Sequence, residues 1–284
     1  MGKNINPYIP DLDLYDSFLV EQFNAACTIS SSSLYEPLAA VYTRRKHIFN
    51  ALDTLYGTGF LEPFAFIEYL LYHRTGNKKR LRTIMPVLDI ELDRQPCSEY
   101  ESLILAINYL YMISLSKIIL DPMLEFKYTK LWYGCKNHLK EWKPEYNHLA
   151  MLAELAPTYT VTSHSSLLGI KAMEKYGRFF EARGMAIQYI YDNKPDASMV
   201  PMIIESVLGI HLSTAKKTFD FVAPDTERFG VYGLRLGRNT VSVNYERGKV
   251  SVNTDRTIYM CAMANGYELK RLPIPASASC TVKL

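Results

Sequence analysis

The hydrophobic pattern of this chain changes character once, and that change constrains the fold more than any other feature. From residue 11 to about residue 220, apolar residues recur every three or four positions, which is typical of helices. From about residue 228 onward, the segments are short, β-branched and partly alternating, which is typical of strands. We therefore expect a helical domain over residues 1–227 and a β-rich domain over residues 228–284.

Two kinds of helical segment alternate in the first domain. FAFIEYLLY (64–72) and LILAINYLYMI (103–113) are apolar on nearly every side, so each needs cover on every side. KKRLRTIMPVLDIELDR (78–94) and MLEFKYTKLWYGCKNHLKEW (123–142) are apolar on one side only. This alternation predicts inner helices wrapped by outer ones and joined as hairpins. A simple four-helix bundle needs fewer helices and a more uniform pattern.

Turn signals separate the strand-like segments of the second domain. They are Gly237-Arg238-Asn239, Glu246-Arg247-Gly248 and Asn265-Gly266, of which Asn-Gly is the strongest signal for a tight hairpin. The pattern predicts a small antiparallel sheet, half of a sandwich packed on the helices.

Composition excludes several classes of protein. The 284 residues carry 32 Lys and Arg against 29 Asp and Glu, a balance too even and too dispersed for a nucleic-acid partner. The five cysteines form no C-x-x-C pair and no zinc-like cluster, so we expect free thiols, no metal and a reducing, cytoplasmic location. The opening residues lack the apolar core of a signal peptide.

The sequence gives little indication of a membrane span or of a cofactor site. LILAINYLYMISLSKIIL (103–120) is the nearest approach to a membrane span, but Asn108 and Lys117 favour a helix buried among other helices. The sequence contains no phosphate loop, no dinucleotide fingerprint and no nucleophile elbow. We expect neither a membrane nor a cofactor.

Three stretches, in this order, resemble the six-hairpin glycosidases, the (α/α) toroid superfamily that includes trehalases, glucosidases and mannosylglycerate hydrolases. They are YDSF (15–18), LEPFAFIEYLLYHRTGNKKRLRTIMPVLDIELD (61–93), and MVPMIIESVLGIHL (199–212) with the strands that follow it. The resemblance implies a mainly α fold: a helical-hairpin toroid or partial toroid, followed by a small antiparallel sheet or sandwich. It also implies a small carbohydrate as ligand.

Glycosidases of this class use two carboxyl groups, one as acid and one as base. The family's S-G-W-D-x-S acid loop is missing here, and YIYDNKPDASMVPMIIE (189–205) has no Glu in the loop where the family places its base. As catalytic candidates we name Glu62 and Glu101. The alternative for Glu62 is a helix-start carboxylate, and for Glu101 a helix cap.

Substrate-binding candidates come from the same resemblance. Asp16 matches a sugar-binding carboxylate of the family. The family's Trp beside this Asp is missing here, so a sugar-stacking aromatic is either lost or replaced by Tyr15. His164, in TVTSHSSLLG, begins a helix that lines the family's sugar site. The alternatives are a helix-dipole carboxylate for Asp16 and a hydrogen-bonded cap for His164.

Two functions therefore stand side by side. The first is a glycoside hydrolase that acts on a small carbohydrate without a cofactor. The second is a non-catalytic relative that serves as a carbohydrate-binding or protein-interaction module, with another protein chain as partner or as the source of missing parts.

Overall fold

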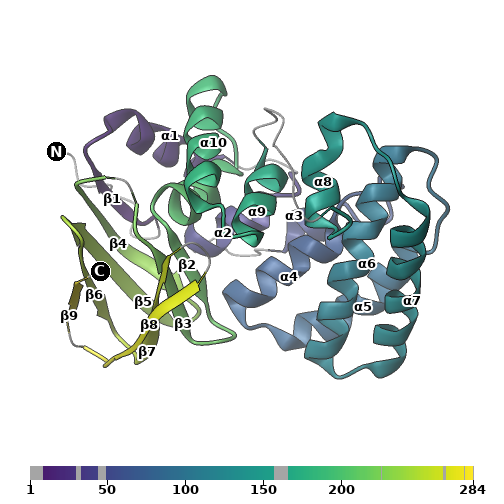
Figure 1. The fold of residues 1–284 in the computed structure, drawn as a ribbon. Coiled ribbons are helices and arrows are strands. Elements are labelled where there is room, and N and C mark those ends of the chain that lie inside the picture. Colours follow the sequence, from purple (N-terminus) through teal and green to yellow (C-terminus); the bar gives the residue numbers. More distant parts are fainter. Residues whose placement is uncertain are drawn as a thin grey trace.

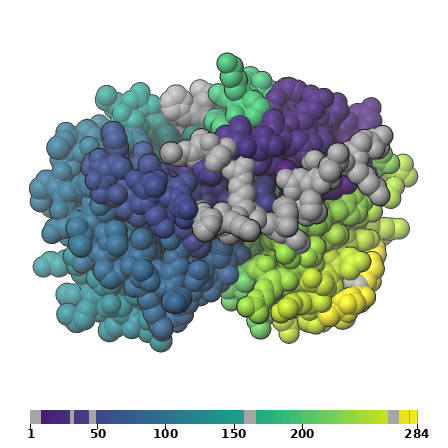
Figure 2. Space-filling view, turned by 180° about the vertical axis from the view of Figure 1, so that it is seen from behind, coloured from purple at the N-terminus to yellow at the C-terminus, as the bar shows by residue number. Residues whose placement is uncertain are grey.

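The computed structural model describes residues 9–29, 33–43, 49–156, 166–224, 226–264, 267–277 and 279–283, with the side chains of 263–270 excepted. Helices form one half of the molecule and two β-sheets form the other (Figure 1). Seen from behind, the purple α1 lies above the sheet half (Figure 2).

The helices follow the segments that the sequence predicted. They are α1 (Ser17–Thr28), α2 (Glu36–Thr43), α3 (Asn50–Asp53), α4 (Phe64–Thr75), α5 (Lys78–Glu91), α6 (Glu99–Ile119), α7 (Pro122–His138), η1 (Pro144–Tyr146), α8 (Asn147–Leu152), α9 (Leu167–Lys175), α10 (Phe179–Asp192), α11 (Met199–Pro201) and the π-helical turn η2 (Met202–Val207).

Burial divides these helices into two groups, as the hydrophobic patterns predicted. In α2, α9 and η2 nearly every side chain is buried, and α4, α6 and α8 are buried along most of their length. The helices α1, α5, α7 and α10 bury one face only. α6 is long and apolar enough to cross a membrane, but 61% of its most apolar stretch is buried inside the protein, so packing accounts for its composition.

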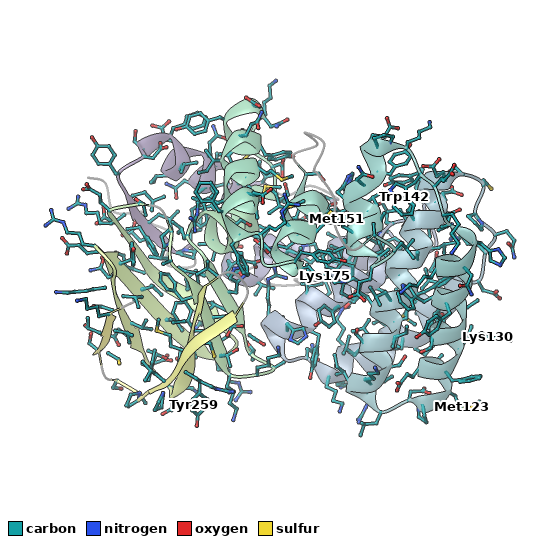
Figure 3. All side chains as sticks on the ribbon, viewed as in Figure 1. Met123, Lys130, Trp142, Met151, Lys175 and Tyr259 are labelled. Carbon is teal, nitrogen blue, oxygen red and sulfur yellow. The ribbon has the colours of Figure 1, made fainter. Side chains whose placement is uncertain are left out.

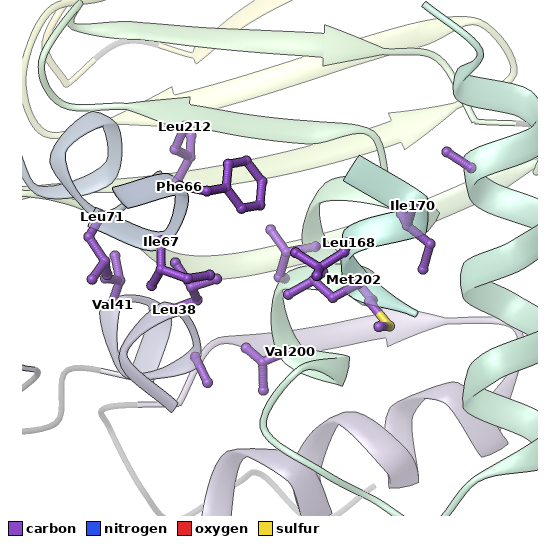
Figure 4. Packing of buried hydrophobic residues seen from close by; sticks show 14 of the residues in the cluster. Leu38, Val41, Phe66, Ile67, Leu71, Leu168, Ile170, Val200, Met202 and Leu212 are labelled. Carbon is purple, nitrogen blue, oxygen red and sulfur yellow. The ribbon is translucent and has the colours of Figure 1, made fainter. Parts of the chain in front are cut away.

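The buried helices contact one another in a closed order, and we call them the inner ring. α2 packs on α4, α4 on α6, α6 on α8, α8 on α9 and α9 on η2; α11, which runs into η2, returns to α2. Apolar side chains from α2, α4, α9 and η2 pack in one hydrophobic cluster, among them Leu38, Ile67, Leu168 and Met202 (Figure 4). Burial of this surface is the main force that holds the ring together.

Two sheets pack beside the ring. The first has the order β1-β4-β5-β6-β9 and the second β2-β3-β7-β8. The strands are β1 (Asp11–Leu14), β2 (Ile210–Ser213), β3 (Thr218–Val222), β4 (Arg228–Leu236), β5 (Asn239–Glu246), β6 (Lys249–Thr254), β7 (Ile258–Ala264), β8 (Tyr267–Ile274) and β9 (Ser279–Lys283).

The sheets differ from the expected one in two ways. β3 and β7 pair in parallel, whereas we expected only antiparallel pairs. Strands β1, β2 and β3 lie before residue 228, so the sheets start earlier than the expected domain boundary. These strands have four or five residues each, too few for alternation to stand out in the sequence, and pairing with distant partners stabilises them. The predicted Asn265-Gly266 turn lies outside the described residues.

A single glycine connects the ring to the sheets. Gly209 follows η2 with a φ of +67°, and a Cβ atom there would lie 1.9 Å from the carbonyl oxygen of Val222. The Gly209 carbonyl accepts a hydrogen bond from the Val222 amide at 2.9 Å. Only glycine combines this conformation with so close an approach, so the position of the second sheet against the ring depends on it.

Candidate functional site

Aromatic and carboxyl side chains gather where the inner helices begin. Tyr35 and Glu62 precede α2 and α4, Tyr100 lies in the first turn of α6, and Asp196 precedes α11. We call these residues, together with Tyr146 and Tyr189, the carboxylate–tyrosine cluster. Residues far apart in the sequence meet here because the inner ring brings its helix starts together.

Tyr35 lies within electrostatic reach of other members of this cluster. Burial raises its pKa above the ordinary range, and the negative charges of Glu62 and Asp196 raise it further. Both carboxyl groups are therefore within electrostatic reach of one phenol. The hydroxyl of Tyr35 therefore stays protonated at neutral pH and can act as a hydrogen-bond donor.

Glu62 has the properties of a proton donor. Burial raises the pKa of its half-buried carboxyl. Among the residues that the structure describes, no hydrogen bond or ion pair engages this carboxyl. Its backbone is fixed, because Asn108 donates to the Glu62 carbonyl at 2.9 Å and accepts from the Ala65 amide at 2.9 Å. The side chain is thus free to act while its position is held.

Asp196 is the second carboxylate of the cluster, and it is firmly held. It accepts hydrogen bonds from the Tyr189 hydroxyl at 2.7 Å and from the Ser198 amide at 2.6 Å. Burial and the bond to Asp196 raise the pKa of Tyr189 to about 12. Asp196 therefore has a fixed orientation.

Two tyrosine rings provide an aromatic surface at the same place. The ring centroids of Tyr100 and Tyr146 lie 5.7 Å apart, and Tyr100 is 38% exposed. Such rings combine an apolar face with a polar edge. A ligand that reaches the two carboxyl groups would meet this surface.

The predicted site residues occupy different places. Glu101 takes part in the cap at the start of α6: its amide donates to Ser98 Oγ at 3.1 Å, and its carboxylate accepts from the Cys97 amide at 2.6 Å. Only Glu62 of the two catalytic candidates lies in the cluster. His164 lies outside the described residues.

Asp16 and Tyr15 lie together at another position. Asp16 caps α1 by accepting from the amides of Phe18 and Leu19, and it accepts from the Tyr191 hydroxyl at 2.6 Å. Tyr15 is 93% exposed. Both residues border a mostly apolar pocket of about 210 Å³ between α1, α10 and β4.

A second polar group lies at the opposite end of α4. Glu205, on η2, accepts from Arg74 Nε at 2.7 Å, from Lys171 Nζ at 2.6 Å and from the Tyr42 hydroxyl. Lys171 also pairs with Glu174 at 2.5 Å. Arg74, Lys171 and Glu205 are each at most 6% exposed. We call these five residues the buried ion network.

Charge pairing dominates this network. Burial by itself would raise the pKa of Glu205, but the charges of Arg74 and Lys171 hold it well below its usual range. The network borders a cavity of about 200 Å³, which opens between α4, α9 and β2. A buried carboxylate with two cationic partners stays ionised and contributes to structure rather than to proton transfer.

The donors of Glu174, Glu205 and His211 lie within 4.8 Å of one another, as metal ligands would. The ammonium group of Lys171, however, contacts both carboxylates. It supplies the positive charge that a metal ion would bring, so this arrangement does not fit a metal site.

Asp196, Tyr35 and Tyr189 were not predicted from the sequence as site residues. A signal was present, because Asp196 lies in the loop where the resemblance places the base, but only a Glu was sought there. Tyr35 and Tyr189 sit at helical spacing and gave no signal that separates a site residue from a core residue.

Comparison with known proteins supports the fold. No protein-family model matches the sequence. The structure is similar to α-L-rhamnosidases of Aspergillus terreus (TM-score 0.64, 9% identity) and Dictyoglomus thermophilum (TM-score 0.62, 9% identity). The two matches cover 97% and 96% of this chain, respectively. A GH78 rhamnosidase of Bacillus sp. GL1 has a TM-score of 0.58 at 11% identity.

These similarities concern the fold alone, since identity is so low. The chain spans 50% of the length of the first two rhamnosidases and 40% of the third. In sequence, 55 residues are 46% identical to an uncharacterized protein of Borreliella burgdorferi; they make up 19% of this chain and 10% of that protein. The chain therefore has a glycoside-hydrolase-like fold, as the resemblance implied; membership of a trehalase-like family does not follow.

Proposed function

We propose that this chain is a short (α/α) toroid that binds a small neutral carbohydrate at the carboxylate–tyrosine cluster and hydrolyses its glycosidic bond. The observation that carries the proposal is that two carboxyl groups, those of Glu62 and Asp196, lie within electrostatic reach of Tyr35. The closed order of inner helices and the similarity to rhamnosidases in fold support the scaffold.

The two carboxyl groups suit different steps. Glu62, with its raised pKa and no ionic partner in the described part of the chain, would protonate the departing glycosidic oxygen. Asp196, oriented by Tyr189 and Ser198, would accept a proton from the attacking water. Tyr35 would donate a hydrogen bond to the sugar between them, and the rings of Tyr100 and Tyr146 would pack against it.

The test is hydrolysis of aryl glycosides by the purified chain and two matched variants. We expect activity on p-nitrophenyl α-L-rhamnoside or on the corresponding α-glucoside or α-mannoside. Glu62→Gln and Asp196→Asn should each lower kcat by about 10²–10⁴. On a dinitrophenyl glycoside, whose leaving group needs no proton, Glu62→Gln should recover most of its rate while Asp196→Asn should not.

If the two variants do not differ in this way, the acid and base roles belong to other residues. If the chain hydrolyses none of these glycosides, the proposed catalysis is wrong. Glu101→Gln is the control, because its carboxylate belongs to a helix cap and its loss should leave kcat unchanged.

A binding function without catalysis is the second candidate. The hydrogen bonds from Tyr189 and Ser198 already occupy the Asp196 carboxylate, which weakens it as a base. Calorimetric titration with L-rhamnose, glucose and trehalose distinguishes the two. Binding that Glu62→Gln weakens, in a chain that hydrolyses none of the glycosides, would favour a carbohydrate-binding module.

A further inference from the structure

Three turns of the sheets converge on one pocket far from the carboxylate–tyrosine cluster. They are the β2–β3 turn, the β4–β5 turn and the loop between β6 and β7, and the pocket between them has a volume of about 370 Å³. Tyr259, whose amide donates to the Lys217 carbonyl at 3.0 Å, marks this end of the sheets in Figure 3.

Each of the three turns brings one cation to the pocket. Lys217, Arg238 and Arg256 border it, and no acidic residue does. Within the described part of the chain, none of these three side chains forms an ion pair or a hydrogen bond. Asp255 is the neighbouring acid, and its carboxylate accepts from the Thr240 amide at 2.8 Å. Unpaired charges of one sign around a hollow create a positive potential inside it.

The backbone that carries these cations is fixed. The buried Asn239 accepts from the Arg256 amide at 3.0 Å and donates to the Arg256 carbonyl at 3.1 Å. Gly237 has a φ of +60°, and a Cβ there would lie 2.9 Å from Thr214, so the first two turns touch. The pocket is therefore built before any ligand binds, which lowers the entropic cost of binding.

We propose that this pocket binds a sugar-sized molecule that carries a phosphate or sulfate group. Guanidinium groups match the oxygens of such anions in pairs, and the Lys217 ammonium adds a third positive charge. The buried Leu236 and Ile258 supply an apolar floor. A volume of about 370 Å³ exceeds what a bare oxyanion fills and lies in the usual range for small-molecule sites.

Calorimetric titration of the whole chain tests this site without any use of hydrolysis. The ligands are glucose 6-phosphate, glucose 6-sulfate, inorganic phosphate and glucose, each at 50 and 200 mM NaCl. One or both of the sugar anions should bind at least about tenfold more tightly than inorganic phosphate. Their binding should be weaker at the higher salt concentration than at the lower. The sugar anion that binds more tightly shows whether the site prefers a phosphate or a sulfate group. Glucose should show no binding that depends on Arg238 or Arg256.

Paired substitutions place the binding. The double variant Arg238→Gln, Arg256→Gln should bind the sugar anion at least about tenfold more weakly. The double variant Arg238→Lys, Arg256→Lys should recover part of the lost affinity. Lys79→Gln with Arg82→Gln removes the same charge from the exposed face of α5 and should change nothing.

Three results would overturn the proposal: no anion binds, the Gln pair binds as tightly as the control pair, or inorganic phosphate binds as tightly as both sugar anions. Since Glu62→Gln leaves these turns intact, it should bind the sugar anion normally even if the proposed hydrolysis fails.

Discussion

Carboxyl and tyrosine side chains lie at both ends of α4, but the two ends differ in the cationic partners of the carboxyl groups. At its start, Glu62 has no ionic partner among the described residues, and both it and Asp196 lie within electrostatic reach of Tyr35. At its end, Arg74 joins the buried ion network, where Glu205 has two cationic partners and a tyrosine donor. The same chemical groups therefore stabilise the fold at one end and remain available for a ligand at the other.

The difference teaches that pairing and burial, rather than residue type, decide the role of a carboxylate. A buried carboxylate whose partners are removed is costly, so paired groups contribute to stability. A half-buried carboxylate without a partner has a raised pKa and can exchange its proton. The following predictions test this contrast, from the largest expected effect to the smallest.

Glu205→Gln should be the most destabilising change. It keeps the shape of the side chain but leaves Arg74 and Lys171 as buried cations without their main partner, which costs about 3–5 kcal/mol. Urea unfolding at pH 7 measures the loss. Glu62→Gln is the matched control and should change the free energy of unfolding by less than about 1 kcal/mol. Equal losses of unfolding free energy in the two variants would show that the carboxyl groups at the two ends of α4 contribute equally to stability.

Tyr42→Phe should cost about 2 kcal/mol, because it removes a buried hydroxyl that donates to the charged Glu205. Tyr189→Phe, which removes the equivalent bond to the half-buried Asp196, should cost about 1 kcal/mol or less. The same unfolding experiment compares them. A larger loss for Tyr189→Phe would show that the bond to Asp196 stabilises the fold more than the buried bond to Glu205 does.

Asp16→Ala should lower the free energy of unfolding by about 1 kcal/mol, since Asp16 caps α1. Asp16→Asn keeps a capping oxygen and should lose only a few tenths. Calorimetry on both variants adds a functional readout. If the Ala variant stays folded but loses carbohydrate binding, the sugar-binding role expected for Asp16 would replace the capping role as its main one.

Glu62 and Glu205 should have opposite effects on stability as pH changes. The pKa of Glu62 is raised in the folded state, so its contribution is full at low pH and is lost as pH rises through that pKa. The pKa of Glu205 is lowered, so its contribution is present above the unfolded pKa and is lost as pH falls.

Unfolding between pH 3 and pH 8 separates the two effects. Wild type should lose stability relative to Glu62→Gln as pH rises, by less than about 1 kcal/mol because solvent screens this half-exposed group. Its advantage over Glu205→Gln should shrink as pH falls. Slopes of the same sign would contradict the assignment.

Local pattern alone predicted much of the fold. Residues 64–72 and 103–113 are apolar all round, and both lie in buried helices, because a helix without a polar face has to be covered. Gly76 ends α4 in the left-handed conformation, and Ser98 caps α6, since these signals act within one turn of chain. The strands after residue 228 follow from their composition in the same way.

The pairing of distant segments was decided only by the tertiary structure. β1 forms because β4 offers it a partner more than 200 residues away, and β3 pairs in parallel with β7; nothing within four or five residues encodes such a choice. The cluster has the same origin. Glu62 could be named from the sequence as a carboxylate at a helix start, but Asp196 became its counterpart only when the ring brought two helix starts to one tyrosine. A sequence sets what each segment can do within a few residues, and packing of the whole chain sets which segments meet.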